Sequence, residues 1–174
     1  MLITHCAASD KGEGLFYPAL DGHAPTDDES VRKKLDPWKV MVIDDDDAVH
    51  QVTVMVLADY DFEGRPVEIV QGYSGGACRH LMKKHPDTAV LLLDVVMETD
   101  AAGLEAVKYI REVLNNKLVR IIVRTGQPGH MQEEDVFSKY DINGYEAKTE
   151  FTAQKLFTCL TTSLRTYCDL LNAK

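Results

Sequence analysis

The feature that most constrains this chain is a short apolar run that ends in a carboxylate, Val90–Asp94, and continues to Glu98. An unbroken apolar run of this length is typical of a strand that is covered on both faces, as in the parallel sheet of an α/β protein. Asp94 then lies at the carboxyl end of the strand, where open α/β sheets place their sites. The run therefore predicts both a fold class and a position for function.

Composition narrows the class of protein. The chain has 174 residues, of which 45% are hydrophobic, and this suits one globular domain with some extra chain. Its net charge of −9 gives no sign of the basic surface that binds nucleic acid directly. The apolar runs are too short to span a bilayer, and the N-terminus lacks the pattern of a secretory signal. We therefore expect a cytoplasmic protein that binds no membrane and keeps its four cysteines as reduced thiols.

The first part of the chain differs from the rest. Residues 1–36 hold scattered glycines and prolines and an acidic cluster at 27–29, and no helix or strand period persists there. The residue before a proline resists helix, so Asp36-Pro37 marks a boundary. We expect an irregular N-terminal extension over residues 1–36 and one regular domain over residues 37–172.

From Trp38 onward, strand and helix patterns alternate five times. We expect strands at 39–43, 67–70, 89–93, 118–123 and 142–147, and helices at about 47–59, 75–84, 104–111, 130–140 and 153–171. Ser74 and Thr152 are expected to cap the second and last helices. Short connections and right-handed crossovers favour a single parallel sheet with helices on both faces, the first and last helices sharing one face.

Helical spacing also predicts which side chains meet the sheet. We expect two apolar stripes, one on the first helix at Val49, Val52, Val56 and Leu57, and one on the last helix at Leu156, Leu160, Leu164, Tyr167 and Leu171. His50 and His80 are expected on helix surfaces. The core is expected to include Met41, Met55 and Met82.

Polar side chains follow four of the predicted strands. Asp44 and Asp45 follow the first strand, Asp94 the third, Thr125 the fourth and Lys148 the fifth. Each has an ordinary explanation alone, since an acidic run often caps a helix and a lone lysine is usually solvated. The carboxyl ends of parallel strands meet at one edge of a sheet, so together these residues predict a shared site.

The chemistry of this set points to phosphoryl transfer. Three neighbouring carboxylates repel one another and need a cation, and oxygen ligands favour Mg²⁺. A carboxylate beside a metal, a lysine and a hydroxyl is suited to accept a phosphoryl group, with the protein supplying position and charge.

Four segments carry a resemblance to a known family: Val42–Asp46, Leu92–Met97, Val123–Gly126 and Tyr145–Lys148. Together they resemble the response-regulator receiver domains of two-component signalling, over about Trp38 to Leu171. The resemblance implies a flavodoxin-like (βα)5 doubly wound parallel sheet with strand order 2-1-3-4-5. It also implies that the chain is a phosphoprotein and not an enzyme.

The resemblance assigns a role to each site residue. Asp94 would be the phosphoacceptor, and Mg²⁺ would be held by Asp45, by Asp44 directly or through water, by Asp94 and by the backbone carbonyl of Val96. Thr125 would hydrogen-bond the phosphoryl group and Lys148 would pair with it. The family's switch aromatic would be Tyr145, which turns inward when Thr125 is drawn toward the phosphate.

Partners follow from the same resemblance. A sensor histidine kinase or phosphotransfer protein would donate the phosphoryl group. The face formed by the helix at 130–140, the strand at 142–147 and the last helix would then control a downstream protein or output domain, or form a homodimer. Segments at 97–100, 124–129, 140–143 and 147–150 resemble a receiver subgroup often found ahead of cyclic-di-GMP phosphodiesterase-type output domains. The chain either acts alone or is a piece of a longer protein.

The sequence departs from the family pattern at two places. Glu98 stands where proline is usual, in a loop at 98–103 that looks one residue longer, and Thr149 follows Lys148 where proline is usual. A non-proline cis bond is costly, so we expect a trans bond between Lys148 and Thr149.

Two other functions are compatible with parts of the pattern. The chain would be a constitutive protein-binding module, a pseudo-receiver, if Glu98 and the longer loop block or mimic the phosphate. A phosphohydrolase with an aspartyl nucleophile needs an acid two residues after the nucleophile, where this chain has Val96. Val96 therefore argues against turnover and predicts a slow loss of phosphate.

Overall fold

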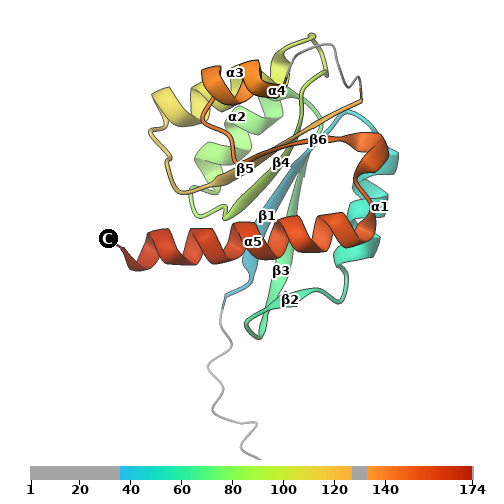
Figure 1. Cartoon of the computed structure of the whole chain (residues 1–174), viewed down its shortest axis with the longest axis vertical. Helices are drawn as coiled ribbons and strands as arrows, with labels where there is room; N and C mark the ends of the chain where they lie inside the picture. The colour runs from blue at the N-terminus through green and yellow to red at the C-terminus, as the bar shows by residue number, and fades with distance from the viewer. Residues whose placement is uncertain (1–35, 127–132, 174) are drawn as a thin grey trace, which may run out of the picture. The chain divides into compact units, whose positions relative to one another are not determined.

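A computed structural model describes residues 36–126 and 133–173 (Figure 1). The expected extension at 1–36 therefore lies outside the described residues, apart from Asp36. The elements are β1 (Trp38–Ile43), α1 (Asp47–Leu57), β2 (Asp61–Phe62), β3 (Arg65–Gly72), α2 (Gly75–Lys84), β4 (Val90–Asp94), α3 (Ala102–Lys108), a π-helical turn (Tyr109–Val113), β5 (Arg120–Thr125), α4 (Glu133–Lys139), β6 (Gly144–Ala147), a 3-10 turn (Lys148–Glu150) and α5 (Ala153–Asn172).

One sheet organises these elements, with the order β2-β3-β1-β4-β5-β6. The last five strands in this order are parallel to one another, and they give the predicted 2-1-3-4-5 arrangement. The fold class predicted from the sequence is therefore confirmed. The two-residue strand β2 was not predicted; it runs antiparallel to β3 through a turn at Glu63 and Gly64, which both have positive φ.

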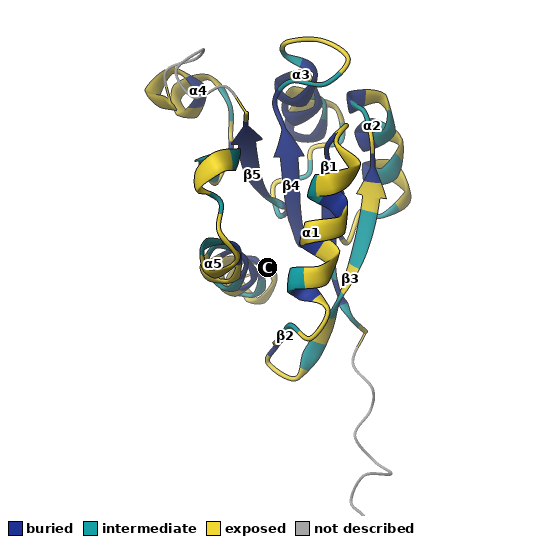
Figure 2. Ribbon diagram, turned by 90° about the vertical axis from the view of Figure 1, so that its right-hand side faces the viewer, coloured by how far each residue is buried: buried dark blue, intermediate teal, exposed yellow. Residues whose placement is uncertain are grey.

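Helices cover both faces of the sheet, as Figure 1 shows, with α2, α3 and α4 on one side and α1 and α5 on the other. Strand side chains alternate between the two resulting cores. In β4, Leu91 and Leu93 pack toward α2 and α3, while Val90 and Leu92 pack toward α5. The central strands β4 and β5 are almost entirely buried (Figure 2).

The buried face of α1 differs from the prediction. The residues that face the sheet are His50, Thr53 and Leu57, whereas Val52 is 59% exposed and Met55 is 77% exposed. Valines occur all around this helix and so do not define one face. His50 is buried because its Nε2 lies 2.8 Å from the carbonyl oxygen of Asp44 and its ring packs on Tyr73.

The other helix predictions fare better. On α5, four residues of the predicted stripe are buried and only Leu171 is exposed, near the end of the helix. Ser74 and Thr152 cap α2 and α5 as expected, since their hydroxyls accept hydrogen bonds from backbone N–H groups of the first turn. Across the described part of the chain, no helix combines the length and apolar character needed to cross a membrane.

Candidate functional site

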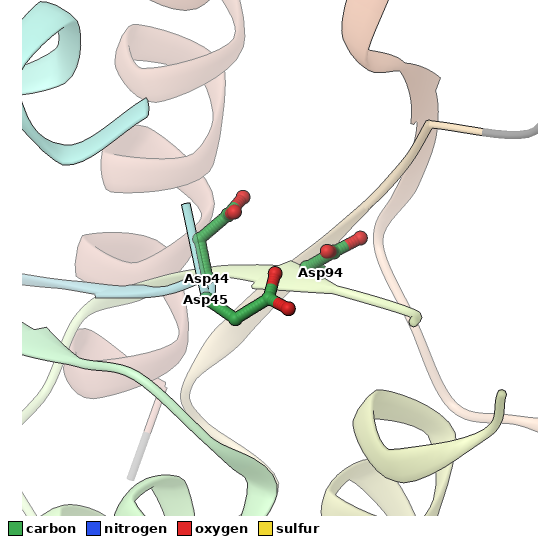
Figure 3. Close-up of side chains that lie close together, drawn as sticks. All are labelled: Asp44, Asp45 and Asp94. Carbon is green, nitrogen blue, oxygen red and sulfur yellow. The ribbon is translucent and has the colours of Figure 1, made fainter. Parts of the chain in front are cut away.

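Three carboxylates meet at the carboxyl ends of β1 and β4. Carboxylate oxygens of Asp44, Asp45 and Asp94 lie within 4.8 Å of one another (Figure 3). Ile43 pairs with Leu93 in the register of the parallel strands β1 and β4. The next residues along the two strands, Asp44 and Asp94, therefore lie side by side. Asp44 and Asp94 are buried, and Asp45 is exposed.

The acidic run that follows β1 divides into two roles. Asp46 is the N-cap of α1, and its side chain accepts a hydrogen bond of 2.8 Å from the backbone N–H of Ala48. The carboxylate of Asp44 accepts the backbone N–H of Asp46 at 3.1 Å. The helix-cap explanation therefore applies to Asp46, and it leaves Asp44 and Asp45 available to the cluster.

Lys148 joins the cluster from the end of β6. Its Nζ lies 2.8 Å from Asp94 Oδ2 and 3.0 Å from Asp44 Oδ1. Burial raises the pKa of Asp94, and repulsion from Asp44 adds to this, although Lys148 opposes it. Burial alone would lower the pKa of Lys148, but its hydrogen bonds to Asp94 and Asp44 outweigh burial and raise that pKa. The lysine thus bridges two carboxylates that would otherwise repel each other.

The remaining predicted residues lie on β5 and β6 or just after β4. Thr125 is the last residue of β5 and is buried, with Ala147 as its partner in β6. Tyr145 lies on β6 and is partly buried against the core under α2, α3 and α4. Val96 follows β4 and packs, partly buried, against the same core. The structure therefore brings Asp44, Asp45, Asp94 and Lys148 together. Val96 follows β4, and Thr125 and Tyr145 lie on the next two strands of the sheet, β5 and β6.

The donor set fits a hard divalent cation. All three carboxylates supply oxygen, and oxygen ligands suit Mg²⁺. Asp94 Oδ1 is buried yet has no hydrogen-bond partner among the described residues, although buried polar atoms are usually paired. An oriented but unused carboxylate oxygen is what a metal or a phosphoryl donor requires.

One buried cation beside the cluster was not singled out from the sequence. Arg124 is 4% exposed, and its Nη2 lies 3.4 Å from Asp44 Oδ2. The guanidinium carbon lies 5.8 Å from the centre of the Phe151 ring. Within the described residues, its Nε has no hydrogen-bond partner. The signal in the sequence is a charged residue that follows the three apolar residues Ile121–Val123 and precedes Thr125.

Glu98, which stands where the family pattern has proline, contacts the start of α2. Its carboxylate accepts the backbone N–H groups of Gly75 at 3.0 Å and Gly76 at 3.3 Å, at the start of α2. The hydrogen bond from Gly75 lowers the pKa of Glu98. A side chain at position 75 would crowd both Glu98 and the carbonyl of Ala102, with contacts of 3.1 Å. The carboxylate of Glu98 thus binds α2 and makes these contacts outside the acidic cluster.

Two backbone details complete the site. The N–H of Gly103 donates to the carbonyl of Val95 at 3.0 Å, and a Cβ at position 103 would lie 2.0 Å from the carbonyl oxygen of Asp94. Glycine therefore lets α3 begin directly against the end of β4. The described residues contain no cis peptide bond, so the predicted trans bond between Lys148 and Thr149 is confirmed.

Several solved structures that match this fold are response-regulator receiver domains or CheY proteins. A receiver domain protein from Clostridium thermocellum matches with a TM-score of 0.63 and 19% identity, covering 76% of this chain and 98% of that one. A CheY-like receiver from Methanospirillum hungatei JF-1 matches with a TM-score of 0.58, 23% identity and coverages of 76% and 98%. The chemotaxis protein CheY4 of Vibrio cholerae gives a TM-score of 0.59, 23% identity and coverages of 74% and 99%. The chain has the receiver-domain fold that its motifs predict.

In sequence, the chain is 43% identical over 159 residues to 3'3'-cGAMP-specific phosphodiesterase 2 of Vibrio cholerae. The match covers 91% of this chain but 30% of that protein, so the chain spans less than a third of its relative's length. The aligned stretch is longer than residues 36–174, so it includes part of residues 1–35. No model of a protein family matches the chain.

Proposed function

We propose that this chain is a phosphorylation-dependent receiver in which Asp94 accepts a phosphoryl group from a sensor histidine kinase or a phosphotransfer protein. The observation that carries the proposal is the state of the Asp94 carboxylate. It is buried at the end of β4, one oxygen contacts Lys148, and the other is unpartnered among the described residues. Asp44, Asp45 and Asp94 would hold Mg²⁺ through carboxylate oxygens that lie within 4.8 Å of one another, together with the backbone carbonyl of Val96.

Each residue has a defined part in the proposed transfer. A carboxylate oxygen of Asp94 forms a bond to phosphorus while the bond from phosphorus to the donor nitrogen breaks. When bound by these residues, Mg²⁺ would neutralise charge on the phosphoryl oxygens. Lys148, already 2.8 Å from Asp94, pairs with the added negative charge. Thr125, at the end of the adjacent strand β5, donates its hydroxyl hydrogen to a phosphoryl oxygen.

The signal would travel through β5 and β6. Thr125 and Tyr145 lie on neighbouring strands, with Val123 opposite Tyr145 and Thr125 opposite Ala147. When Thr125 moves toward the phosphoryl group, Tyr145 would turn further into the core that it already touches. This would reset the face formed by α4, β6 and α5, where a downstream partner or a second copy binds. The device is a two-state element biased by a covalent change in charge.

The relative from Vibrio cholerae suggests the nature of the output. That protein is a phosphodiesterase and is more than three times as long as the matched stretch. We propose that this chain controls an output of phosphodiesterase type, either in the same polypeptide or in a partner. The chain itself would not turn over substrate, because the position two residues after Asp94 is Val96, which has no acid–base group.

The test is labelling by a small acyl phosphate, with and without Mg²⁺, followed by intact-mass spectrometry. We expect the parent to gain one phosphoryl group only with Mg²⁺, and Asp94→Asn to gain none. Asp87→Asn is the matched control, because it removes a carboxylate that pairs with Lys39 outside the cluster. Equal labelling of Asp94→Asn and the parent would disprove the assignment.

Metal binding separates this proposal from a constitutive binding module. The single tryptophan, Trp38, begins β1 and Asp44 follows its other end, so tryptophan fluorescence is a poor reporter of the site. Isothermal titration with Mg²⁺ is the better measurement. A parent that binds no Mg²⁺ and takes no label would support the binding-module alternative.

A further inference from the structure

We propose that Arg124 is a positioning residue for the site. Its buried positive charge weakens Mg²⁺ binding before phosphorylation and stabilises the site after a phosphoryl group arrives. The inference rests on the proposed function, because it concerns the metal and phosphoryl group assigned to Asp44, Asp45 and Asp94. It assigns to Arg124 a part that Lys148 alone does not fill.

The contacts of Arg124 hold its charge beside a proposed metal ligand. Nη2 lies 3.4 Å from Asp44 Oδ2, and Asp44 is fully buried. Arg124 is the register partner of Asp94 between β5 and β4, and its carbonyl accepts the N–H of Val95 at 3.1 Å. The backbone of Arg124 is thus tied to the phosphoacceptor strand while its side chain reaches the neighbouring carboxylate.

The environment of Arg124 is poor for a purely structural arginine. The ring of Phe151 lies near the guanidinium carbon, and within the described residues Nε has no hydrogen-bond partner. Burying an incompletely paired charge destabilises a fold, and an apolar side chain of similar size is often better there. The three preceding residues of β5, Ile121–Val123, are apolar and buried. The charge therefore has a use that the strand itself does not explain.

The formal charges of the site indicate what the positive charge of Arg124 contributes. Without metal, the carboxylates of Asp44, Asp45 and Asp94 face the cations of Lys148 and Arg124, which leaves one net negative charge. A divalent cation turns this into one net positive charge. A phosphoryl group then gives Asp94 close to two negative charges in place of one and brings the site near neutrality.

Removing Arg124 would shift every state by one negative charge. The metal-free site would carry two net negative charges, so Mg²⁺ would bind more tightly. The metal-bound site would already be neutral, so the phosphoryl group would leave it with one net negative charge in a buried setting, where charge is costly. Arg124 thus moves favourable free energy from metal binding to phosphoryl binding.

The test compares these two affinities in Arg124→Met, which keeps an unbranched side chain and loses the charge. Isothermal titration with Mg²⁺ should give an affinity roughly tenfold tighter than the parent's, equivalent to about 1.4 kcal/mol. Titration of a fluoroberyllate, a phosphoryl analogue, at saturating Mg²⁺ should give an affinity roughly tenfold weaker. Arg124→Lys, which restores the charge, should return both affinities toward the parent's.

Arg120→Met is the matched control. Arg120 lies at the opposite end of β5, where its guanidinium donates to the carbonyls of Lys117 and Leu118. Arg120→Met changes the net charge of the protein by the same amount as Arg124→Met. If the effect depends on a charge beside Asp44, both affinities of Arg120→Met should stay at the parent's values. Equal shifts in Arg120→Met and Arg124→Met would reduce the effect to overall charge and overturn the inference.

The pattern of outcomes separates the possible failures. A purely structural role for Arg124 would weaken both affinities together, and that result, or no change in either, would overturn the inference while leaving the proposed function intact. A parent protein that binds neither Mg²⁺ nor the fluoroberyllate would overturn the proposed function and the inference with it. Thermal unfolding of each variant confirms that the titrated protein is folded.

Discussion

Two buried arginines occupy opposite ends of the sheet, and their surroundings differ. Arg111 and Arg124 are each 4% exposed. Arg111 lies before β5 and β6, where its guanidinium donates to the carbonyls of Asp141, Asn116 and Val119 and lies 3.4 Å from the side-chain oxygen of Asn143. Arg124 lies at the other end of β5, where its Nη2 lies 3.4 Å from Asp44 Oδ2.

The two arginines differ in how completely their charge and their N–H donors are paired. Arg111 ties the segments before two strands together, and Asp141, whose carboxylate lies 3.1 Å from its Nε, balances its charge. Such a well-paired cation stabilises the fold. Arg124 is paired with a carboxylate that also contacts Lys148, and one donor is unpartnered among the described residues. An under-satisfied buried charge beside other charges points to a site.

The largest expected effect comes from breaking the structural member of the pair. Arg111→Met should lower the free energy of unfolding by about 3 kcal/mol, because it leaves the carbonyls of Asp141, Asn116 and Val119 without this donor and removes a buried, paired charge. Urea unfolding followed by circular dichroism measures the loss. The affinity for Mg²⁺ should match the parent's at temperatures where the variant is folded.

Arg79→Met provides a control for the loss of a positive charge, since Arg79 lies on α2 and is partly exposed. It should change the free energy of unfolding by less than about 0.5 kcal/mol, as substitutions away from the core usually do. Similar losses in Arg79→Met and Arg111→Met would mean that the hydrogen bonds of Arg111 do not hold the strands together.

A smaller effect of opposite sign is expected at the site. Burial raises the pKa of Asp94, so its ionised form destabilises the metal-free fold. A group with a raised pKa contributes stability below its unfolded pKa and loses that contribution as pH rises through its folded pKa. Asp94→Asn should therefore raise the free energy of unfolding at neutral pH by roughly 1 kcal/mol.

Urea unfolding in the presence of a chelator, at neutral pH and at about pH 3, checks the sign. The gain should vanish at the lower pH, where Asp94 is protonated in both the folded and unfolded states. Saturating Mg²⁺ should reduce the gain at neutral pH, because it stabilises the parent through this carboxylate. If the variant were less stable than the parent at neutral pH without metal, ionised Asp94 would not destabilise the fold as proposed.

Much of the fold and part of the site could be predicted from local pattern. Apolar runs such as Val90–Leu93 specify buried strands, and parallel topology then requires that Asp44, Asp94 and Lys148 meet at one edge. The strand order follows from the resemblance of the motifs, and the sheet confirms it.

The unpredicted features depend on contacts between distant residues. Arg124 contacts Asp44, which lies 80 positions earlier in the chain, and Glu98 accepts a hydrogen bond from Gly75, which lies 23 positions earlier. His50 has the spacing of a surface residue, but the carbonyl of Asp44 and the ring of Tyr73 bury it. Periodicity cannot report such pairings, because each depends on how two separate segments of the chain approach in space.

The smallest effect tests whether every charged residue near the carboxyl edge belongs to the site. Glu98 is exposed, and the hydrogen bond from Gly75 lowers its pKa. A lowered pKa contributes stability above the unfolded value of about 4.5 and loses it as pH falls through the folded pKa. Glu98→Ala should therefore lower the free energy of unfolding at neutral pH by only about 0.5 kcal/mol, since solvent screens the interaction.

Asp100→Ala is the control, because Asp100 is exposed in the same loop and carries the same charge. Unfolding measured in urea at neutral pH and at about pH 3 should show the deficit of Glu98→Ala closing at the lower pH. The affinity for Mg²⁺ should change less than roughly twofold, since Glu98 binds the start of α2 and not the cluster. A large loss of Mg²⁺ affinity would instead place Glu98 with Arg124 among the residues that set the site's charge.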